Sequence, residues 1–321
     1  MIRVVITLLL ISVCSFFAQS QESSPDEYEY IVVFPNPEDD WLFGFHGAVS
    51  DSVHGTAKWF DSFFATDVVD ESSTKSLARI RLGWEPRARD FDVFTQRFRV
   101  RVKLPNLEDK VDLVFSDEDD DDKQNDQVQQ GRSLANDNNE SFTAAIRLIN
   151  VDKVSKFIDT RVGISGGDIF TKARLKWTSD FSDVHEFELQ PSIFYYAQDG
   201  FGQRMFTEYA YNYADKKQFR INYSIKYSEA FDGHRWKNGY YYLNQIDRRR
   251  ATVVGVVING ENGADRGFVV DNYTLSFRYR VNAYRKWLYF EIEPFIEWPE
   301  EEDYSTTPGI ALRVEGYFTK S

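Results

Sequence analysis

The stretch that decides the fold is Val269–Phe318, with the sequence VVDNYTLSFRYRVNAYRKWLYFEIEPFIEWPEEEDYSTTPGIALRVEGYF. Within Tyr273–Val281, apolar and aromatic side chains occupy every second position, and polar or charged side chains occupy the positions between them. Successive residues of a β-strand point to opposite faces, so this spacing predicts a strand with one apolar and one polar face. The alternation returns in Leu288–Trp298 and in Ile310–Phe318, after an acidic connection.

The polar faces of these strands carry fixed charges, namely Arg278, Arg280, Glu291, Glu293, Arg313 and Glu315. A water-soluble sandwich would bury such a face, and buried charges without partners are costly. In a membrane barrel the apolar face meets lipid and the charged face meets a watery or ion-paired lumen. Leu288–Trp298 is long enough to cross a bilayer, and the aromatic content of 16% suits interfacial positions. The sequence therefore predicts an all-β, transmembrane, antiparallel up-and-down barrel.

Residues 1–20 have the features of a secretory signal peptide. Arg3 provides a positive charge, an apolar core follows, and small residues near Ser20 suit a cleavage site. The only cysteine, Cys14, would be lost with this signal, so the mature chain would form no disulfide and no thiolate metal site. A lipoprotein signal is the less favoured alternative, because Val13 stands where a small residue should precede Cys14.

The composition argues against several other classes of protein. Beyond residue 20 the sequence has no run of about eighteen apolar residues, which excludes a helical membrane span. The formal net charge of -13 argues against a nucleic-acid partner, which would need a basic patch. The sequence predicts no cofactor.

Residues 21–73 differ from the barrel sequence, and we expect them to form a periplasmic extension. An acidic, proline-containing stretch comes first and is expected to be irregular. In Asp51–Ala65, apolar and aromatic residues recur at helical spacing, which predicts a short amphipathic helix. Packing of this helix against the periplasmic rim or mouth of the barrel is favoured. Partial plugging of the lumen and a periplasmic protein contact are the alternatives.

The barrel is expected to span residues 74–318. Alternation predicts fourteen strands: Ala78–Trp84, Phe98–Leu104, Val111–Phe115, Phe142–Ile149, Val162–Ser165, Ile169–Trp177, Phe187–Tyr195, Met205–Tyr213, Phe219–Tyr227, Tyr240–Ile246, Ala251–Ile258 and the three strands above. Pro191 is expected to interrupt the seventh strand. Merging the doubtful fifth and sixth strands would break the even count, so a barrel of twelve strands would require the loss of another strand as well.

The connections set the expected orientation. Bacterial outer-membrane barrels keep short turns on the periplasmic side and long loops outside. The acidic segment 116–140 is the longest connection, so it is expected to face outward. The even strand count then places 229–239, 260–267 and 299–308 on the same side.

The C-terminal run VDNYTLSFRYRVNAYRKWLYFEIEPFIEWP, followed by TPGIALRVEGYF, resembles an uncharacterised family of Gram-negative outer-membrane β-barrel proteins. RIRLGWEP and FRVRVKLPNLEDKVDLVFSDEDDDD are similar to the same family, and the resemblance covers about Ser52–Phe318. It implies a barrel in the cell outer membrane, in contact with lipid and lipopolysaccharide, and it implies no activity. Gly309–Phe318 also resembles the terminal-strand signal of the barrel assembly machinery, although Thr319-Lys320-Ser321 follow it here.

The inward-facing charges predict the character of the lumen. The candidate lumen-lining residues, proposed as a selectivity or ion-pair set, are Arg79, Arg81, Arg97, Arg99, Arg101, Arg147, Lys172, Arg174, Arg278, Arg280, Glu291, Glu293, Arg313 and Glu315. Basic residues dominate the first six strands, whereas Glu186, Glu188, Glu208 and Glu297 lie on later ones, so a basic wall would face a partly acidic one.

Two functions are compatible with such a lumen. The leading hypothesis is a porin-like pore or transport protein whose arginines favour small anionic solutes, since rings of fixed charge set selectivity. The alternative is a closed structural or binding barrel of the cell envelope, in which the charges pair across a narrow lumen and hold it rigid.

Catalysis is not predicted. Barrel hydrolases hold a Ser and a His, or paired Asp and His, near the membrane interface. His46 and His54 precede the barrel, and His185 falls in a predicted periplasmic turn. Only His234, within EAFDGHRW, falls in an outer loop, and a lone loop histidine is ordinarily a solvated side chain.

The acidic run Asp117–Asp122 is a candidate calcium ligand group, because it offers several carboxylates. It lacks the ligand spacing and the turn glycine of an EF-hand loop. A solvated loop is therefore the favoured interpretation.

Overall fold

The computed structural model describes Phe63 and residues 76–103, 111–116, 142–153, 156–263, 266–285 and 287–320. The predicted signal peptide, most of the extension 21–73 and the acidic run Asp117–Asp122 lie outside these residues. The described strands are β1 (Ser76–Trp84), β2 (Phe94–Lys103), β3 (Val111–Ser116), β4 (Thr143–Lys153), β5 (Lys156–Ser165), β6 (Asp168–Ser182), β7 (His185–Tyr196), β8 (Gly200–Ala214), β9 (Lys217–Ser228), β10 (Gly233–Asp247), β11 (Arg250–Gly263), β12 (Gly267–Asn282), β13 (Leu288–Pro299) and β14 (Thr307–Lys320). A single short 3-10 helix, η2 (Glu300–Glu302), is described between β13 and β14.

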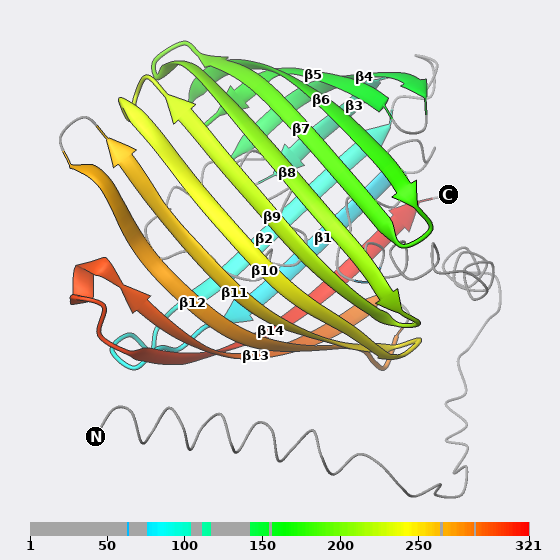
Figure 1. Ribbon diagram of the computed structural model, residues 1–321. Helices are drawn as coiled ribbons and strands as arrows, with labels where there is room; N and C mark the ends of the chain where they lie inside the picture. The colour runs from blue at the N-terminus through cyan, green and yellow to red at the C-terminus, as the bar shows by residue number, and fades with distance from the viewer. Residues whose placement is uncertain are drawn as a thin grey trace, which may run out of the picture. The chain divides into compact units, whose positions relative to one another are not determined.

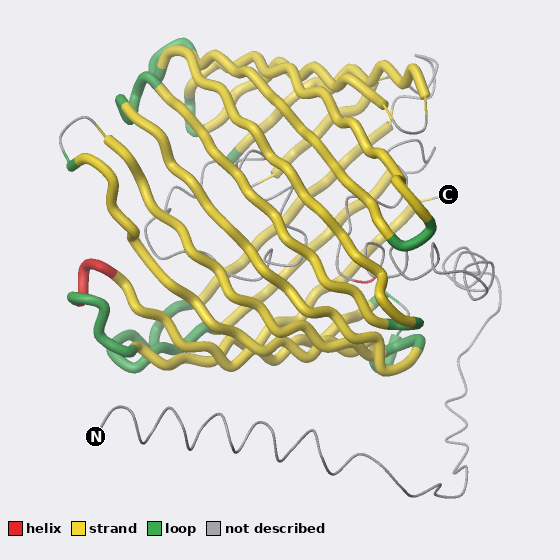
Figure 2. The backbone as a smooth tube through the Cα atoms, in the orientation of Figure 1, coloured by secondary structure: helices red, strands yellow, loops and turns green. Residues whose placement is uncertain are grey.

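The strands of the described chain form one closed barrel, in which each strand pairs antiparallel with its neighbours in sequence (Figures 1 and 2). β1 pairs with β14 over nine residue pairs, from Ser76↔Lys320 to Trp84↔Leu312, and this pairing closes the ring. The fold prediction is confirmed: the described residues form fourteen strands in an up-and-down order. We call the end at which odd-numbered strands finish the distal end, and the end near Lys320 the proximal end.

Several connections are as short as antiparallel hairpins allow. Gly166 and Gly167 join β5 to β6, and both have positive φ, 58° and 87°. Two consecutive positive φ values match a type I′ turn, whose twist suits paired strands, and glycine adopts them without steric cost. The two glycines therefore separate two real strands, and the doubtful fifth and sixth strands do not merge.

The strand boundaries differ from the sequence prediction in informative places. β5 starts at Lys156 and not at Val162, and β10 starts at Gly233, so most of the predicted outer loop 229–239 belongs to a strand. β7 continues through Pro191, which pairs with Met205 of β8. Because proline lacks an N–H group, the ladder on the other side has a gap there, between Arg174↔Ser192 and Trp177↔Leu189.

The outer surface of the barrel is apolar. Leu275 is 40% exposed, whereas the adjacent Thr274 is 2% exposed, as expected when one strand face points outward and the other inward. The exposed apolar side chains continue around the barrel as Ile80, Leu82, Ile146, Leu148, Ile158, Val162, Ile164, Ile193, Val256, Phe277, Ile292, Leu312 and Val314. This is the reverse of a water-soluble fold, and it matches a barrel whose outer face meets hydrocarbon.

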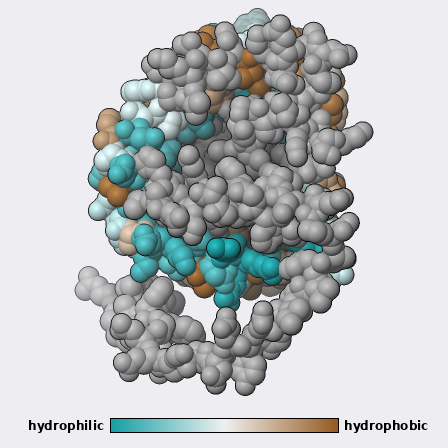
Figure 3. Space-filling model, turned by 90° about the vertical axis from the view of Figure 1, so that its right-hand side faces the viewer, coloured by the Kyte–Doolittle hydropathy of each residue, from teal (hydrophilic) through white to brown (hydrophobic). Residues whose placement is uncertain are grey.

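Aromatic side chains lie near both ends of the apolar surface. Trp84 stacks on Phe94 at the distal end, and Trp287 contacts Phe318 at the proximal end. Figure 3 shows hydrophobic residues along the margin of one end of the barrel and hydrophilic residues gathered in the lower part of that view. Among the described residues, no helix combines the length and the apolar character needed to cross a membrane.

Candidate functional site: the charged inner face

The structure places the fourteen candidate lumen residues on the strand face opposite the exposed apolar side chains. Twelve of these are buried: Arg79, Arg81, Arg101, Arg147, Lys172, Arg174, Arg278, Arg280, Glu291, Glu293, Arg313 and Glu315. Arg97 and Arg99 are half-buried. Most of the buried members fall into two groups of ion pairs on different parts of the barrel wall.

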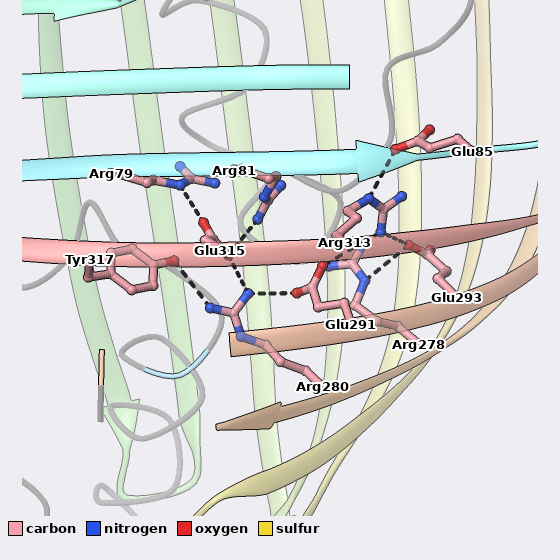
Figure 4. A network of polar contacts seen from close by, with 10 residues as sticks. All are labelled: Arg79, Arg81, Glu85, Arg278, Arg280, Glu291, Glu293, Arg313, Glu315 and Tyr317. Atoms are coloured by element: carbon pink, nitrogen blue, oxygen red, sulfur yellow. Dashed lines mark hydrogen bonds and ion pairs between the residues drawn. The ribbon is translucent and has the colours of Figure 1, made fainter. Parts of the chain in front are cut away.

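The first group, which we call the Glu315 network, consists of the ten residues labelled in Figure 4. Its centre is Glu315 on β14, whose carboxylate accepts hydrogen bonds from Arg79 and Arg81 of β1 and from Arg280 of β12. The Arg81 and Arg280 nitrogens lie 3.0 and 2.7 Å from Oε2 of Glu315. Arg280 also bonds Glu291 of β13 at 2.6 Å.

The network continues toward the distal end through Arg313 of β14. Its Nη1 donates to Oε2 of Glu293 at 2.6 Å and lies 3.6 Å from Glu291. Its Nε donates to Glu85, just beyond β1, at 3.0 Å. Arg278 completes the set with a 3.2 Å bond from Nε to Glu293. Arg313 thus has three carboxylates within 4 Å, so its charge does not depend on one partner.

The Glu315 network spans the seam where the two ends of the sheet meet. Arg81 is directly opposite Glu315 in the β1–β14 register, and Glu291 is opposite both Arg280 and Arg313. Opposite charges at such cross-strand positions attract, and in a low-dielectric interior the attraction is strong. The ion pairs therefore join residues more than 230 positions apart in sequence across the seam.

The second group, which we call the Asp159 cluster, consists of Asp112, Arg147, Asp159, Arg161 and Arg174 on β3–β6. Three guanidinium groups converge on a single oxygen, Oδ2 of Asp159: Arg174 at 2.6 Å, Arg147 at 2.8 Å and Arg161 at 3.2 Å. Asp112 lies 3.9 Å from Arg147. Arg174 also donates to Gln190 at 3.3 Å and lies over the ring of Phe157.

Strand register explains this convergence. Arg147 is directly opposite Arg161, a like-charged pair that would repel. Asp159 precedes Arg161 by two positions on the same face of β5, and it is directly opposite Arg174 of β6. One carboxylate therefore lies between three arginines from three neighbouring strands.

The remaining basic candidates extend these groups along the sheet. Arg97 and Arg99 of β2 are opposite Arg81 and Arg79 of β1, and Lys172 of β6 is opposite Arg161. On the inner face of β1–β6, the described basic residues are Arg79, Arg81, Arg97, Arg99, Arg101, Arg147, Arg161, Lys172, Arg174 and Lys176, whereas the described carboxylates are Asp112, Asp159, Asp168 and Asp180. We call this the basic band.

The later strands contain mixed charges. Lys176 bonds Glu188 at 3.1 Å, and Arg220 of β9 bonds Glu208 of β8 at 3.1 Å. Arg278, Arg280 and Arg313 add further arginines among the glutamates of β13 and β14. These contacts show acidic and basic residues side by side on the later strands, where the sequence predicts a partly acidic wall.

Sequence reasoning missed Glu85, Asp112, Asp159 and Arg161. Asp159 and Arg161 were missed because the fifth strand was expected to begin at Val162. The signal was present in KFIDTRVGIS, where Ile158, Thr160, Val162 and Ile164 alternate with Phe157, Asp159, Arg161 and Gly163. A strand started six residues earlier would have placed both charges on the inner face.

A separate set of polar contacts lies at the distal rim. Glu302 of η2 accepts hydrogen bonds from the Thr307 hydroxyl at 2.5 Å and from Arg89 in the β1–β2 connection. The hydrogen bond from Thr307 and the nearby Arg89 lower the pKa of Glu302 below its ordinary value. Backbone bonds from Ala88 to Pro308 and from Ile310 to Pro86 join the same two segments. The rim thus links the β1–β2 connection to the start of β14.

The two described histidines lie on strands. His185 is the first residue of β7 and not part of a turn; its ring stacks on Tyr211 and bonds the Tyr209 hydroxyl at 2.7 Å. His234, expected in an outer loop, is the second residue of β10 and contacts the ring of Tyr227. Within the described parts of the chain, no group of three or more His, Cys, Asp or Glu side chains is arranged to hold a metal ion.

Solved structures with a similar arrangement include three outer-membrane barrels. OprB of Pseudomonas putida, in its high-pH structure, has a TM-score of 0.49 and 10% identity, over 79% of this chain and 96% of that chain. OprD of Pseudomonas aeruginosa has a TM-score of 0.47 and 8% identity, over 77% and 95%. OmpT of Vibrio cholerae, an outer membrane protein with loop L8 deleted, has a TM-score of 0.47 and 8% identity, over 76% and 98%. No protein-family model and no curated protein matches the chain.

Proposed function

We propose that this chain is an outer-membrane barrel that admits small anionic solutes into its lumen. The single observation that carries the proposal is the basic band on β1–β6, where three arginines share one oxygen of Asp159. Together with Asp112, the cluster has three guanidinium groups and two carboxylates, which leaves a local excess of one positive charge. Such an excess on a low-dielectric wall attracts anions and repels cations.

The outer membrane is the proposed location because of the outer surface of the barrel. Its exposed apolar side chains need a hydrocarbon surrounding, and a closed barrel leaves no unpaired strand edge in that surrounding. Lipid and lipopolysaccharide are then the immediate partners of this surface. The barrel assembly machinery is the proposed partner during insertion, and the aromatic-rich strand β14 would carry its signal.

Solute flux into liposomes tests the proposal. Purified protein reconstituted into liposomes would be offered three solutes of similar size: gluconate, glucose and glucosamine. We expect the flux to be highest for gluconate and lowest for glucosamine, since only the charge differs appreciably. Equal fluxes, or a preference for glucosamine, would contradict anion selection.

A closed barrel of the cell envelope is the second candidate, and the Glu315 network favours it. The side chains of Arg280, Arg313 and Glu315 are at most 1% exposed, so this part of the wall is closely covered. Buried charges that pair across adjacent strands hold those strands in one arrangement. Liposomes that admit none of the three solutes would favour this candidate over transport.

A further inference from the structure

One part of the inner wall is apolar. Tyr241 and Leu243 on β10, Ala251, Val253 and Val257 on β11, Tyr289 on β13 and Tyr317 on β14 form one buried cluster, which we call the inner apolar patch. Leu243 and Ala251 have 0% exposure, and Val253 has 3%. The barrel wall covers only the base and the flanks of an inward-facing side chain. A leucine that faced a water-filled lumen would therefore be partly exposed at its tip. The burial of Leu243 therefore indicates that the patch is covered from the lumen side.

Phe63 belongs to the same cluster and lies far from it in sequence. Its ring makes an edge-to-face contact with Tyr289, with ring centroids 5.6 Å apart, and Phe63 is 2% exposed. The guanidinium of Arg280 lies 5.7 Å from the Phe63 ring and 4.3 Å from the Tyr289 ring. Arg280 therefore lies near the faces of two aromatic rings, where cation–π attraction compensates part of its desolvation.

The floor of the patch is shaped by glycine. A Cβ atom at Gly239 would come within 2.5 Å of the Tyr241 ring, and one at Gly255 within 3.0 Å. The ring of Tyr241 therefore lies close against the wall over these two glycines, a position that a larger residue would prevent. Tyr241 belongs to the same buried cluster as Phe63.

We infer that the inner apolar patch is a docking surface for the N-terminal segment of this same chain, anchored by Phe63. Phe63 is the occupant that the structure places there, and it falls within Asp51–Ala65, for which the sequence predicts an amphipathic helix. The sequence favoured packing of that segment at the rim or mouth of the barrel. Phe63 contacts the inward-facing residues Arg280 and Tyr289 near the proximal ends of β12 and β13, so the anchor lies at this mouth of the barrel, on the lumen side of the wall.

Docking at this position has a chemical consequence for the Glu315 network. Arg280 connects Glu315 and Glu291, and Tyr317 accepts a 3.1 Å bond from Arg280 while its ring contacts Tyr289. Phe63 thus covers the lumen side of the network at its proximal end. Removal of this anchor would admit water to Arg280 and weaken its ion pairs.

Site-specific photo-crosslinking tests the inference in the full-length chain. p-Benzoylphenylalanine would replace Phe63 in the barrel reconstituted in detergent or liposomes, and mass spectrometry would locate the products. We expect crosslinks to peptides of β10, β11, β13 or β14 within the same molecule. A matched control at Phe91, 65% exposed in the β1–β2 connection, should not crosslink to these peptides. Crosslinks from position 63 to other strands or to a second molecule, or none at all, would overturn the inference.

Thiol accessibility gives a second, independent readout. The only other cysteine in the sequence is Cys14, so Phe63→Cys with Cys14→Ser provides a single thiol. We expect a membrane-impermeant maleimide to label it about tenfold more slowly than a Phe91→Cys control, and Val253→Asp to abolish this difference. Folded protein would be identified by its heat-dependent gel mobility. Equal labelling at positions 63 and 91 in the otherwise unchanged folded barrel would contradict docking.

Discussion

The two charged groups on the inner wall differ in how their arginines are partnered. In the Glu315 network, five arginines and four glutamates are distributed over four strands, and Arg313 has three carboxylates within 4 Å. In the Asp159 cluster, three arginines converge on one oxygen of Asp159, and the second carboxylate, Asp112, lies 3.9 Å from Arg147.

This difference suggests a division of roles along the wall. Pairing across the β1–β14 seam is distributed over four glutamates and stabilises ring closure, and Phe63 contacts Tyr289 beside it. Pairing on β4–β6 converges on one oxygen of Asp159, and in the proposed function this is the part of the wall that attracts an anionic solute. Substitutions in the two groups distinguish the two kinds of pairing.

Asp159→Asn is expected to have the largest effect. It leaves three buried guanidinium groups without their common carboxylate, and the loss of one partner of a buried ion pair costs about 3–5 kcal/mol of unfolding free energy. The measurement is urea unfolding in detergent, followed by the heat-dependent gel shift. Asp199→Asn, in the exposed β7–β8 turn, is the matched control and should have little effect. A stability equal to that of the control would show that the cluster is hydrated.

Glu293→Gln is expected to have a smaller effect, about 1–3 kcal/mol, because it removes the carboxylate partner of one buried arginine, Arg278, and not of three, and the amide oxygen of Gln can still accept a hydrogen bond from it. Arg313 retains Glu85 at 3.0 Å and Glu291 at 3.6 Å. The same urea-unfolding assay compares the unfolding free energy of this variant with that of Asp159→Asn. If Glu293→Gln were the more destabilising of the two substitutions, distributed pairing would not provide the redundancy that we infer.

The smallest expected effect concerns pH and the distal rim. The pKa of Glu302 is lowered by the Thr307 hydroxyl and by Arg89, so folding favours its carboxylate form. The ionised Glu302 therefore stabilises the folded distal rim above the ordinary carboxyl pKa. This stabilisation is lost as the pH falls through the lowered pKa of Glu302. Limited proteolysis of 300–306 should accelerate in that acidic range, and Glu302→Gln should make cleavage fast and independent of pH. Cleavage of the unchanged chain that does not vary with pH would contradict this linkage.

The sequence predicted the strands well because alternation is a local signal. Tyr273–Val281 and Leu288–Trp298 show both faces directly, and the fourteen-strand count is confirmed even though Pro191 and Gly166-Gly167 obscured two strands. The ion pairs were harder to predict, because Asp159 meets Arg147 and Arg174 only through the register of β4, β5 and β6. The contact of Phe63 with Tyr289 joins residues 226 positions apart, and no periodicity in either segment specifies it.

The reversal potential in a planar bilayer with a salt gradient tests the division of roles most directly. The unchanged barrel should be anion-selective. Arg161→Gln, in the Asp159 cluster, should reduce the anion preference, and Arg278→Gln, in the Glu315 network, should leave it nearly unchanged. A cation-selective barrel, or a shift from Arg278→Gln as large as that from Arg161→Gln, would contradict the account.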